Sequence, residues 1–176
     1  EAGADPQAVM DSLKEKYGDA IDKIGLDGKV YPATESSTPN DARWADQWNM
    51  ERVQVASAWD KLIELGIPTS GVRETIVAVI DTGTELTNSD LANMLWTNPG
   101  EIPDNGIDDD ENGYVDDVYG YNFYNDNSDV DDDSGHGTHC AGVIAAQANN
   151  DVGVAGIASQ YANVKIMTLK FLGADG

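Results

Sequence analysis

Two side chains of this sequence have the type and the setting that proton-transfer chemistry needs. Asp81 ends the β-branched apolar run 75–80, which predicts a strand. His136 stands between two glycines, ahead of a small-residue, helix-compatible stretch that runs to Gln147. An acid at the C-terminal end of a strand and a histidine at a helix start can meet at the edge of a parallel sheet, where α/β enzymes place their chemistry. Together they would form the base system that activates a nucleophile.

The segments around this pair resemble the catalytic aspartate and histidine motifs of the subtilisin-like serine proteases. They read Val-Ile-Asp-Thr-Gly at 79–83 and Gly-His-Gly-Thr-His-Cys-Ala-Gly at 135–142. The resemblance extends from about residue 40 to the C-terminus and includes segments near 40–60 and 150–158. It implies a serine endopeptidase that acts on peptides or proteins, in which Asp81 fixes the tautomer of His136 and His136 takes the proton of a serine.

The family's serine lies in a Gly-Thr-Ser-Met-Ala-type motif beyond the histidine, with an oxyanion asparagine between the two. None of the nine serines of this sequence stands in that motif. We therefore expect an N-terminal part of a catalytic domain, which is inactive alone and whose partner is the remainder of that domain. The alternative is a non-catalytic calcium-binding fragment or a processed chain.

The elements that would position the pair predict an α/β fold. The runs 75–80 and 164–169 read as strands, and the helix-compatible stretch between them implies a parallel sheet. Residues 51–65 read as a helix, the segment 91–96 as a short apolar piece compatible with a helix, and the segment 98–135 as a long surface loop held by ions. The resemblance implies that residues 41–176 form part of the family's three-layer fold, with helices flanking the sheet.

Residues 1–40 differ in character from the rest. Asp5-Pro6 starts a helical pattern that ends at Gly18, a weak strand follows over 21–31, and the polar linker 32–40 comes last. This order resembles the end of a propeptide, so we expect a zymogen. The alternative is an N-terminal extension of the mature protein.

The acidic run 108–117 has the spacing of a loop that wraps a hard cation. Oxygen ligands at the first, third and fifth positions, a glycine at the sixth and a carbonyl at the seventh suit Ca²⁺. Tyr119 departs from the pattern, because the twelfth position should be a glutamate, and Asp117 could complete the shell instead. A solvated acidic loop is the alternative. The ligands predicted by the spacing are Asp108, Asp110, Asn112, the Tyr114 carbonyl and Asp116.

The family resemblance implies a second Ca²⁺ site. A glutamine near the mature N-terminus, an aspartate nine residues after the catalytic one and the turn after the histidine helix would share the ion. Alternating carbonyls in such a turn suit a cation independently of the resemblance. The implied ligands are the side chains of Gln47, Asp90 and Asn150 and the carbonyls of Ala148, Val152 and Val154.

Three other chemistries fit the residues less well. Asp81 and Asp133 each begin an Asp-Thr/Ser-Gly triplet like those of aspartic proteases, but Asp133 follows an acidic run and not a strand. His136 and His139 lack the spacing and the glutamate of a zincin motif. Cys140, four residues after His136, could form a Cys-His nucleophile pair, but we expect it to be a buried packing thiol. It is the only cysteine, which excludes an internal disulfide.

The net charge of −22 and the isoelectric point near 4.1 argue against nucleic-acid binding, because phosphates would be repelled. No apolar run is long enough to span a bilayer. Glu1 begins no signal peptide, and the resemblance leads us to expect a secreted protein or one of the secretory pathway.

Overall fold

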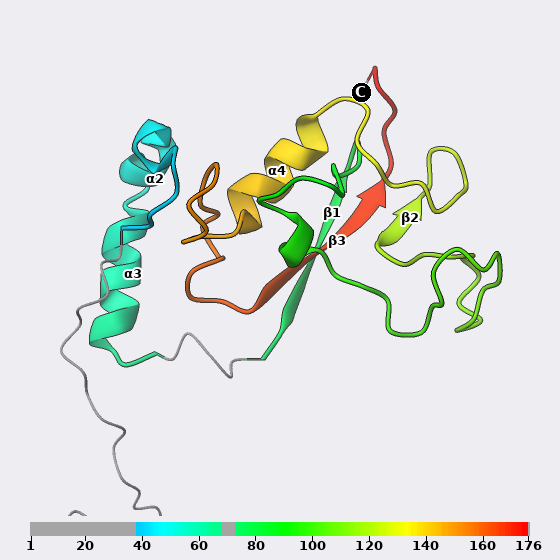
Figure 1. The fold of residues 1–176 in the computed structure, drawn as a ribbon, viewed down its shortest axis with the longest axis horizontal. Coiled ribbons are helices and arrows are strands. Elements are labelled where there is room, and N and C mark those ends of the chain that lie inside the picture. The colour runs from blue at the N-terminus through cyan, green and yellow to red at the C-terminus, as the bar shows by residue number, and fades with distance from the viewer. Residues whose placement is uncertain (1–37, 68–72, 176) are drawn as a thin grey trace, which may run out of the picture. The chain divides into compact units, whose positions relative to one another are not determined.

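A computed structural model of the chain describes residues 38–67 and 73–175 and shows an α/β fold (Figure 1). The strands β1 (Thr75–Asp81), β2 (Gly120–Asn122) and β3 (Val164–Lys170) form a parallel sheet in the order β1-β3-β2. The α/β class with a parallel sheet and flanking helices is confirmed. The two predicted strands correspond to β1 and β3.

The central strand β3 carries most of the sheet's core. It alternates buried and half-buried side chains, and it pairs with β1 so that Asp81 lies opposite Lys170. On β1 the buried Val79 joins the core, whereas Ile76 and Ile80 are 46% and 65% exposed. Successive side chains of a strand point to opposite faces. The described helices therefore leave the Ile76 and Ile80 side of β1 uncovered.

The helix α4 (His136–Ala145) lies over the sheet (Figure 1). Its buried face carries only glycine and alanine, which allows a very close approach. A Cβ atom at Gly137 would lie 2.1 Å from the carbonyl oxygen of Gly83. The predicted helix is confirmed and ends two residues before Gln147. The core beneath it consists of Val79, Leu91, Ala141, Ala145, Val164 and Ile166.

The N-terminal helical region is divided in two, where the sequence predicted one helix over 51–65. A 3₁₀ turn, η2 (Trp44–Asp46), precedes α2 (Trp48–Arg52) and α3 (Val55–Glu64). Gln54 separates the two helices with a φ of +59°. A left-handed residue cannot continue a right-handed helix, so the single-helix prediction was wrong at this point.

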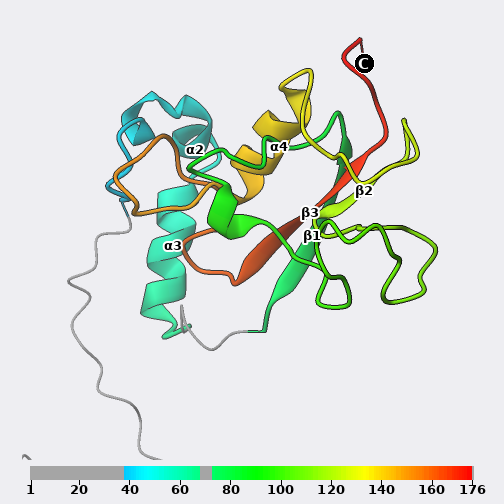
Figure 2. The same ribbon diagram turned by 45° about the vertical axis from the view of Figure 1, so that its right-hand side comes forward.

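A second core cluster fixes these helices to the segment that follows α4. The segment runs beside α2 and α3 in both ribbon views (Figure 2). The indole N–H of Trp59 donates to the carbonyl of Ile157 at 3.1 Å, and the Trp44 and Trp59 rings stack with centroids 5.6 Å apart. The cluster consists of Met50, Val55, Trp59, Ala155 and Tyr161.

The predicted loop 98–135 is largely irregular but contains β2, which the sequence did not predict. In the short apolar segment 91–96, which precedes this loop, only η3 (Ala92–Met94) is helical, as a 3₁₀ turn. The propeptide-like features of residues 1–37 lie outside the described residues. Among those that are described, no helix has both the length and the apolar character that a membrane span requires.

Candidate active site

Asp81 and His136 meet where the end of β1 faces the start of α4. Nδ1 of His136 lies 2.8 Å and 2.9 Å from the two carboxylate oxygens of Asp81. The backbone N–H of Thr82 also donates to this carboxylate, at 2.8 Å. The Asp81 side chain is 13% exposed, whereas that of His136 is 67% exposed. The two predicted residues therefore form a pair in which a largely buried carboxylate holds an accessible imidazole.

The electrostatics of the pair favour an ionised aspartate. Burial raises the pKa of Asp81, but hydrogen bonds from His136 and Thr82 and the attraction of the imidazole outweigh burial and leave this pKa below its ordinary value. A carboxylate at Nδ1 favours the tautomer in which Nδ1 carries the proton. Nε2 then has a free lone pair on the side away from Asp81, and it can accept a proton from a group that approaches there.

Cys140 also reaches this pair. Its Sγ lies 3.9 Å from Nδ1 of His136, one helical turn along α4, and the thiol is half-buried against the core beneath the helix. Burial, the charge of Asp81, a hydrogen bond to Asp81 and the charge of Asp132 raise the pKa of the thiol. A thiol with a raised pKa is a poor nucleophile at neutral pH. The packing role fits, although Cys140 is less buried than expected because it borders the pair.

The loop before α4 is organised by Asp132, which no sequence motif marked. Its carboxylate accepts hydrogen bonds from the backbone N–H groups of Ser134, Gly135 and Thr138. The hydroxyl groups of Thr82 and Thr138 donate to it as well. Burial raises the pKa of Asp132, but these hydrogen bonds to the ionised form hold it well below its ordinary range.

The acidic loop, residues 101–117, is held by hydrogen bonds from its own backbone N–H groups to its carboxylates. Asp108 accepts from two backbone N–H groups of its own turn, at 3.0 Å and 2.8 Å. Asp116 accepts from the N–H groups of Asn105 and Gly106, at 3.1 Å and 2.9 Å. The carboxylate of Asp116 therefore faces a neighbouring turn. A carboxylate has acceptor capacity beyond two N–H groups, so the ligand set predicted from spacing, Asp116 included, stays a prediction.

The structure brings Asp110 of the predicted set and Asp117, which could complete the shell, together with a third carboxylate, Glu101, that the spacing did not indicate. One oxygen from each of Glu101, Asp110 and Asp117 lies within 4.8 Å of the others. Glu101 and Asp117 are each 8% exposed, and Oε2 of Glu101 has no hydrogen-bond partner in the described part of the chain. Carboxylates buried so close together repel one another unless a cation neutralises them. Their oxygens are the ligands that Ca²⁺ prefers.

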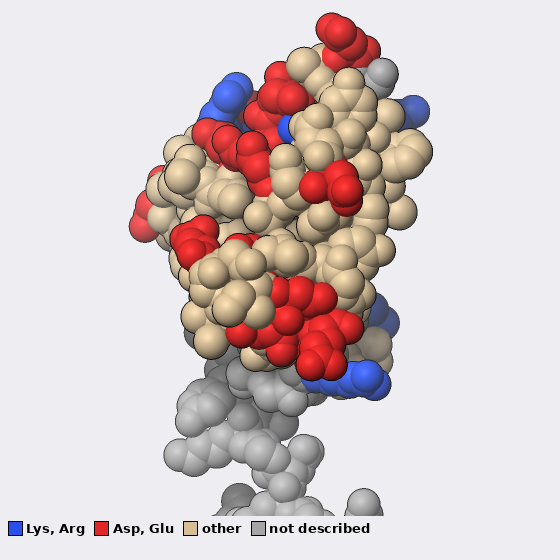
Figure 3. Space-filling view, turned by 90° about the vertical axis from the view of Figure 1, so that its right-hand side faces the viewer, with Lys and Arg blue, Asp and Glu red and all other residues tan. Residues whose placement is uncertain are grey.

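The remaining residues of the predicted set border this cluster. The Asn112 side-chain amide donates to Asp117 at 3.1 Å, and the Tyr114 ring packs against Tyr121 with centroids 4.6 Å apart. On the side of the molecule to which the acidic loop belongs, Asp and Glu side chains form a dense group on the surface (Figure 3). The acidic loop thus has a buried carboxylate cluster at its base and more acidic groups around it.

The turn after α4 lies against Asp90, as the second implied site requires. The Asp90 carboxylate accepts from the side-chain amide of Asn150 and from the backbone N–H of Val154, both at 2.8 Å. The Asn150 side-chain oxygen accepts from the N–H of Val152 at 2.9 Å. Ala148 packs against the second core cluster. The aspartate and the turn are therefore brought together.

Gln47 is engaged elsewhere, and Asp41 is better placed to bind a cation. The Gln47 side-chain amide exchanges two hydrogen bonds with the backbone of Ala155, both at 2.9 Å. Asp41 is 5% exposed. Its Oδ2 accepts from the N–H of Asn149 in the turn at 2.8 Å, and its Oδ1 has no partner among the described residues. A buried carboxylate oxygen without a partner is costly. A cation bound here would therefore give the unpartnered oxygen of Asp41 a partner, whereas both polar groups of the Gln47 side chain already have one.

Comparison with known proteins decides the family. Residues 72–176 match the description "Subtilase family". The chain belongs to the subtilase family. Subtilisin-like protease 1 of Plasmodium berghei (strain Anka) is 36% identical over 133 residues, which cover 74% of this chain and 21% of that protein. Thermitase of Thermoactinomyces vulgaris is 31% identical over 133 residues, which cover 75% of this chain and 37% of that protein.

This subtilase chain spans well under half the length of the curated relatives that it matches. Subtilisin-like protease 1 of Plasmodium falciparum (isolate 3D7) is 40% identical over 112 residues, 63% of this chain and 16% of that protein. Among solved structures, a protease from Pseudoalteromonas arctica PAMC 21717 is 28% identical, with a TM-score of 0.49, and the match covers 79% of this chain and 40% of that one. The family predicted from the two motifs is confirmed.

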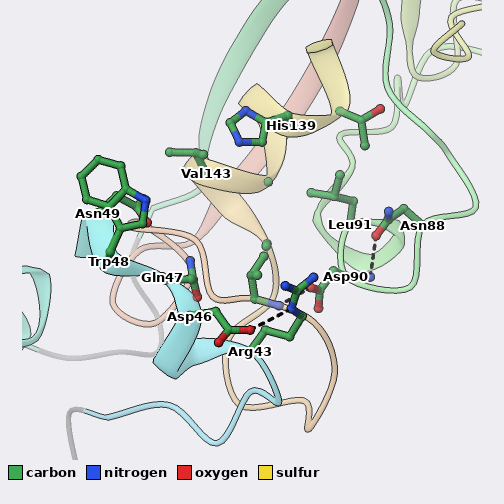
Figure 4. A pocket seen from close by; sticks show the side chains of 14 residues that line it. Arg43, Asp46, Gln47, Trp48, Asn49, Asn88, Asp90, Leu91, His139 and Val143 are labelled. Carbon is green, nitrogen blue, oxygen red and sulfur yellow. Dashed lines mark hydrogen bonds and ion pairs between the residues drawn. The ribbon is translucent and has the colours of Figure 1, made fainter. Parts of the chain in front are cut away.

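A hollow of about 530 Å³ lies on another surface of the subtilase chain. His139 and Val143 of α4 line it together with Trp48 of α2 and Asp90 (Figure 4). His139 is exposed, and His136 is not among the residues that line the hollow. His139 therefore belongs to the lining of this hollow, whereas His136 belongs to the pair with Asp81.

Proposed function

We propose that this subtilase chain supplies the aspartate and the histidine of a serine endopeptidase of the subtilisin type. The 2.8 Å contact between Nδ1 of His136 and the carboxylate of Asp81 carries the proposal. A carboxylate-held imidazole with an accessible second nitrogen is the base system of a catalytic triad. The relatives named above are proteases, which supports the same function.

In the proposed reaction, Nε2 of His136 takes the proton of a serine hydroxyl as the serine oxygen attacks a peptide carbonyl. Asp81 stabilises the imidazolium that forms, and His136 then returns the proton to the leaving amine. Water hydrolyses the resulting acyl-enzyme with the same base. The Gly-Thr-Ser-Met-Ala-type motif is absent from these 176 residues, so the serine would belong to the remainder of the catalytic domain and this chain alone would be inactive.

We also propose that the fold binds Ca²⁺ at two places. The unpartnered oxygens of Glu101 and Asp41, both buried, support one site each. The first would be held by Glu101, Asp110 and Asp117. The second would be held by Asp41, Asp90 and the turn 148–154. Calcium at these sites would neutralise buried carboxylates and stabilise the loops; it takes no part in the proposed proton transfer.

A propeptide and secretion belong to the same proposal. The polar linker 32–40 precedes the segment that resembles the start of the mature enzyme, and a Ser-, Thr- and Pro-rich linker is a suitable cleavage site. Active full-length enzyme would then carry a new N-terminus within residues 32–46. N-terminal sequencing that finds Glu1 intact in fully active enzyme would overturn the propeptide.

Hydrolysis of fluorescent casein by the longest natural polypeptide that carries this sequence tests the proposed activity. We expect His136→Ala to lower the rate by about a thousandfold or more. His139→Ala is the matched control, because His139 lines the other surface, and it should keep activity. A His136→Ala protein that hydrolyses casein as fast as the wild type would contradict the function.

A further inference from the structure

We propose that Asp132 is a positioning residue that holds Asp81 and His136 in register. The inference rests on the proposed peptidase function for its consequence in catalysis. Its geometry stands apart from that function, because the hydrogen bonds of the Asp132 side chain in the described part of the chain go to Thr82, Ser134, Gly135 and Thr138 and to neither catalytic side chain. It acts instead on the residues that follow them, Thr82 and the first turn of α4.

The first observation is the number of donors that converge on this one carboxylate. Oδ1 accepts from the Thr82 hydroxyl at 2.8 Å and from the N–H groups of Ser134 and Gly135 at 3.0 Å and 2.9 Å. Oδ2 accepts from the N–H and the hydroxyl of Thr138 at 2.8 Å and 2.5 Å. Three of these donors are backbone N–H groups, and that of Thr138 belongs to the first turn of α4, so the carboxylate satisfies one of the free N–H groups of the helix that carries His136.

The second observation is that the two hydroxyl groups form reciprocal bridges between β1 and α4. The Thr82 hydroxyl, next to Asp81, accepts the N–H of Gly137, next to His136, at 3.0 Å. The Thr138 hydroxyl, on α4, accepts the N–H of Glu85, beyond β1, at 2.9 Å. Each element thus accepts a backbone N–H from the other, and both bridging hydroxyls donate their own proton to Asp132.

A negatively charged acceptor is what these bridges need. A hydroxyl that accepts a backbone N–H has one proton left to donate, and a carboxylate only accepts. An asparagine at position 132 would place its NH₂ group where one carboxylate oxygen of Asp132 lies. An NH₂ group cannot accept a hydrogen bond, so at least one hydroxyl or N–H would lose its acceptor. The bridge on that side would then reorient, and the end of β1 would shift relative to α4.

The flanks of Asp132 are held independently from β3. The Lys170 amine donates to the carbonyl of Asp131 at 2.7 Å and pairs with Asp133 at 3.1 Å. The segment around Asp132 therefore keeps its place when the Asp132 side chain changes. A variant at this position should disturb the bridges while leaving the loop backbone anchored.

The test uses the 176-residue chain with both of its histidines labelled in the ring with ¹⁵N. In the wild type, the Nδ1 proton shared with Asp81 should appear as a downfield resonance of His136. We expect Asp132→Asn to lose this resonance, because the imidazole no longer rests against Asp81. Asp129→Asn removes the same charge from the same loop without touching the bridges, and it should keep the resonance.

A folded Asp132→Asn chain that keeps the His136 resonance would overturn the proposal. If Asp132→Asn does not fold, Thr82→Val and Thr138→Val decide, since each removes one bridge. Loss of the resonance in either supports the proposal, and retention in both overturns it.

In the longest natural polypeptide, Asp132→Asn should lower kcat by about ten- to a hundredfold with little change in KM, as misplaced catalytic groups do. A rise in KM of about ten- to a hundredfold with kcat unchanged would overturn the positioning role. A wild-type protein that shows the resonance and its dependence on Asp132 but hydrolyses no peptide would reject the proposed function and leave the positioning role standing.

Discussion

The amine of Lys170, whose side chain is 4% exposed, lies 3.1 Å from the carboxylate of Asp133, whose side chain is 48% exposed. Lys170 is opposite Asp81 in the register of the sheet, yet its amine binds the loop that leads into α4. A buried ammonium depends on its partners, because the ion loses its hydration on burial. This ion pair therefore ties the central strand to the start of the histidine helix.

Removing only the Asp133 carboxylate should lower the stability of the fold, because it leaves the Lys170 ammonium buried without its carboxylate partner. We expect Asp133→Ala to lower the free energy of unfolding by about 1–2 kcal/mol, less than for a fully buried pair because Asp133 is half exposed. The double variant Asp133→Ala with Lys170→Met should be no less stable than Asp133→Ala alone, since the unpaired charge is gone. Urea unfolding measures both. A double variant whose loss of stability equals the sum of two large losses in the single variants would contradict the pairing.

The stability contributed by Asp132 should depend on pH. Its pKa is held well below the ordinary value, so its contribution is fully present above the unfolded-state pKa of about 4 and is lost as the pH falls through the folded-state value. We expect the difference in unfolding free energy between wild type and Asp132→Asn to be constant from about pH 5 to 7 and to shrink below about pH 4. Melting curves across this range measure it. A difference in unfolding free energy that grows below about pH 4 would contradict stabilisation by hydrogen bonds to the ionised Asp132.

Calcium should stabilise the fold through the cluster under the acidic loop. A ligand at about a hundred times its dissociation constant adds about 2.7 kcal/mol to the free energy of unfolding. The melting temperature should therefore be higher in millimolar Ca²⁺ than in chelator. Glu101→Gln should reduce this difference. Asp104→Asn, which removes an exposed charge from the same loop, should leave it intact. An unchanged calcium response in Glu101→Gln would remove this site.

The second calcium site separates Asp41 from Gln47. Asp41→Asn should reduce the calcium response, because the buried oxygen without a partner is lost. Gln47→Ala should lower stability by about 1 kcal/mol for its two hydrogen bonds to Ala155, and by the same amount with and without Ca²⁺. Calorimetric melts of the two variants in both conditions test this. The reverse assignment holds if only Gln47→Ala loses the calcium response.

The parts of the fold that the sequence predicts correctly are those with a repeating pattern or a complete motif. The β-branched runs of β1 and β3 and the small residues of α4 signal their structures locally. By contrast, β2 is only three residues long and exists because it pairs with β3. The break at Gln54 depends on a single left-handed residue, and no glycine or proline marks it.

The site divides in the same way. Asp81 and His136 are recognisable because each lies in a motif whose neighbours the chemistry constrains. Asp41, Glu101 and Asp132 are three of thirty-two acidic residues, and their roles depend on which donors and carboxylates fold around them. Spacing alone favoured Asp116, which the structure turns toward the N–H groups of a neighbouring turn. Burial and partners, which sequence does not record, identified the others.

In the proposed enzyme, Asp81 and His136 of this chain activate a serine that these 176 residues do not contain. A fluorophosphonate probe, which reacts with activated serines, tests it in the longest natural polypeptide that carries the sequence. Mass spectrometry should find the label on a serine outside the nine of this sequence, and labelling should be lost in His136→Ala. A label on one of these nine serines, or labelling of His136→Ala at the wild-type rate, would contradict the proposed function.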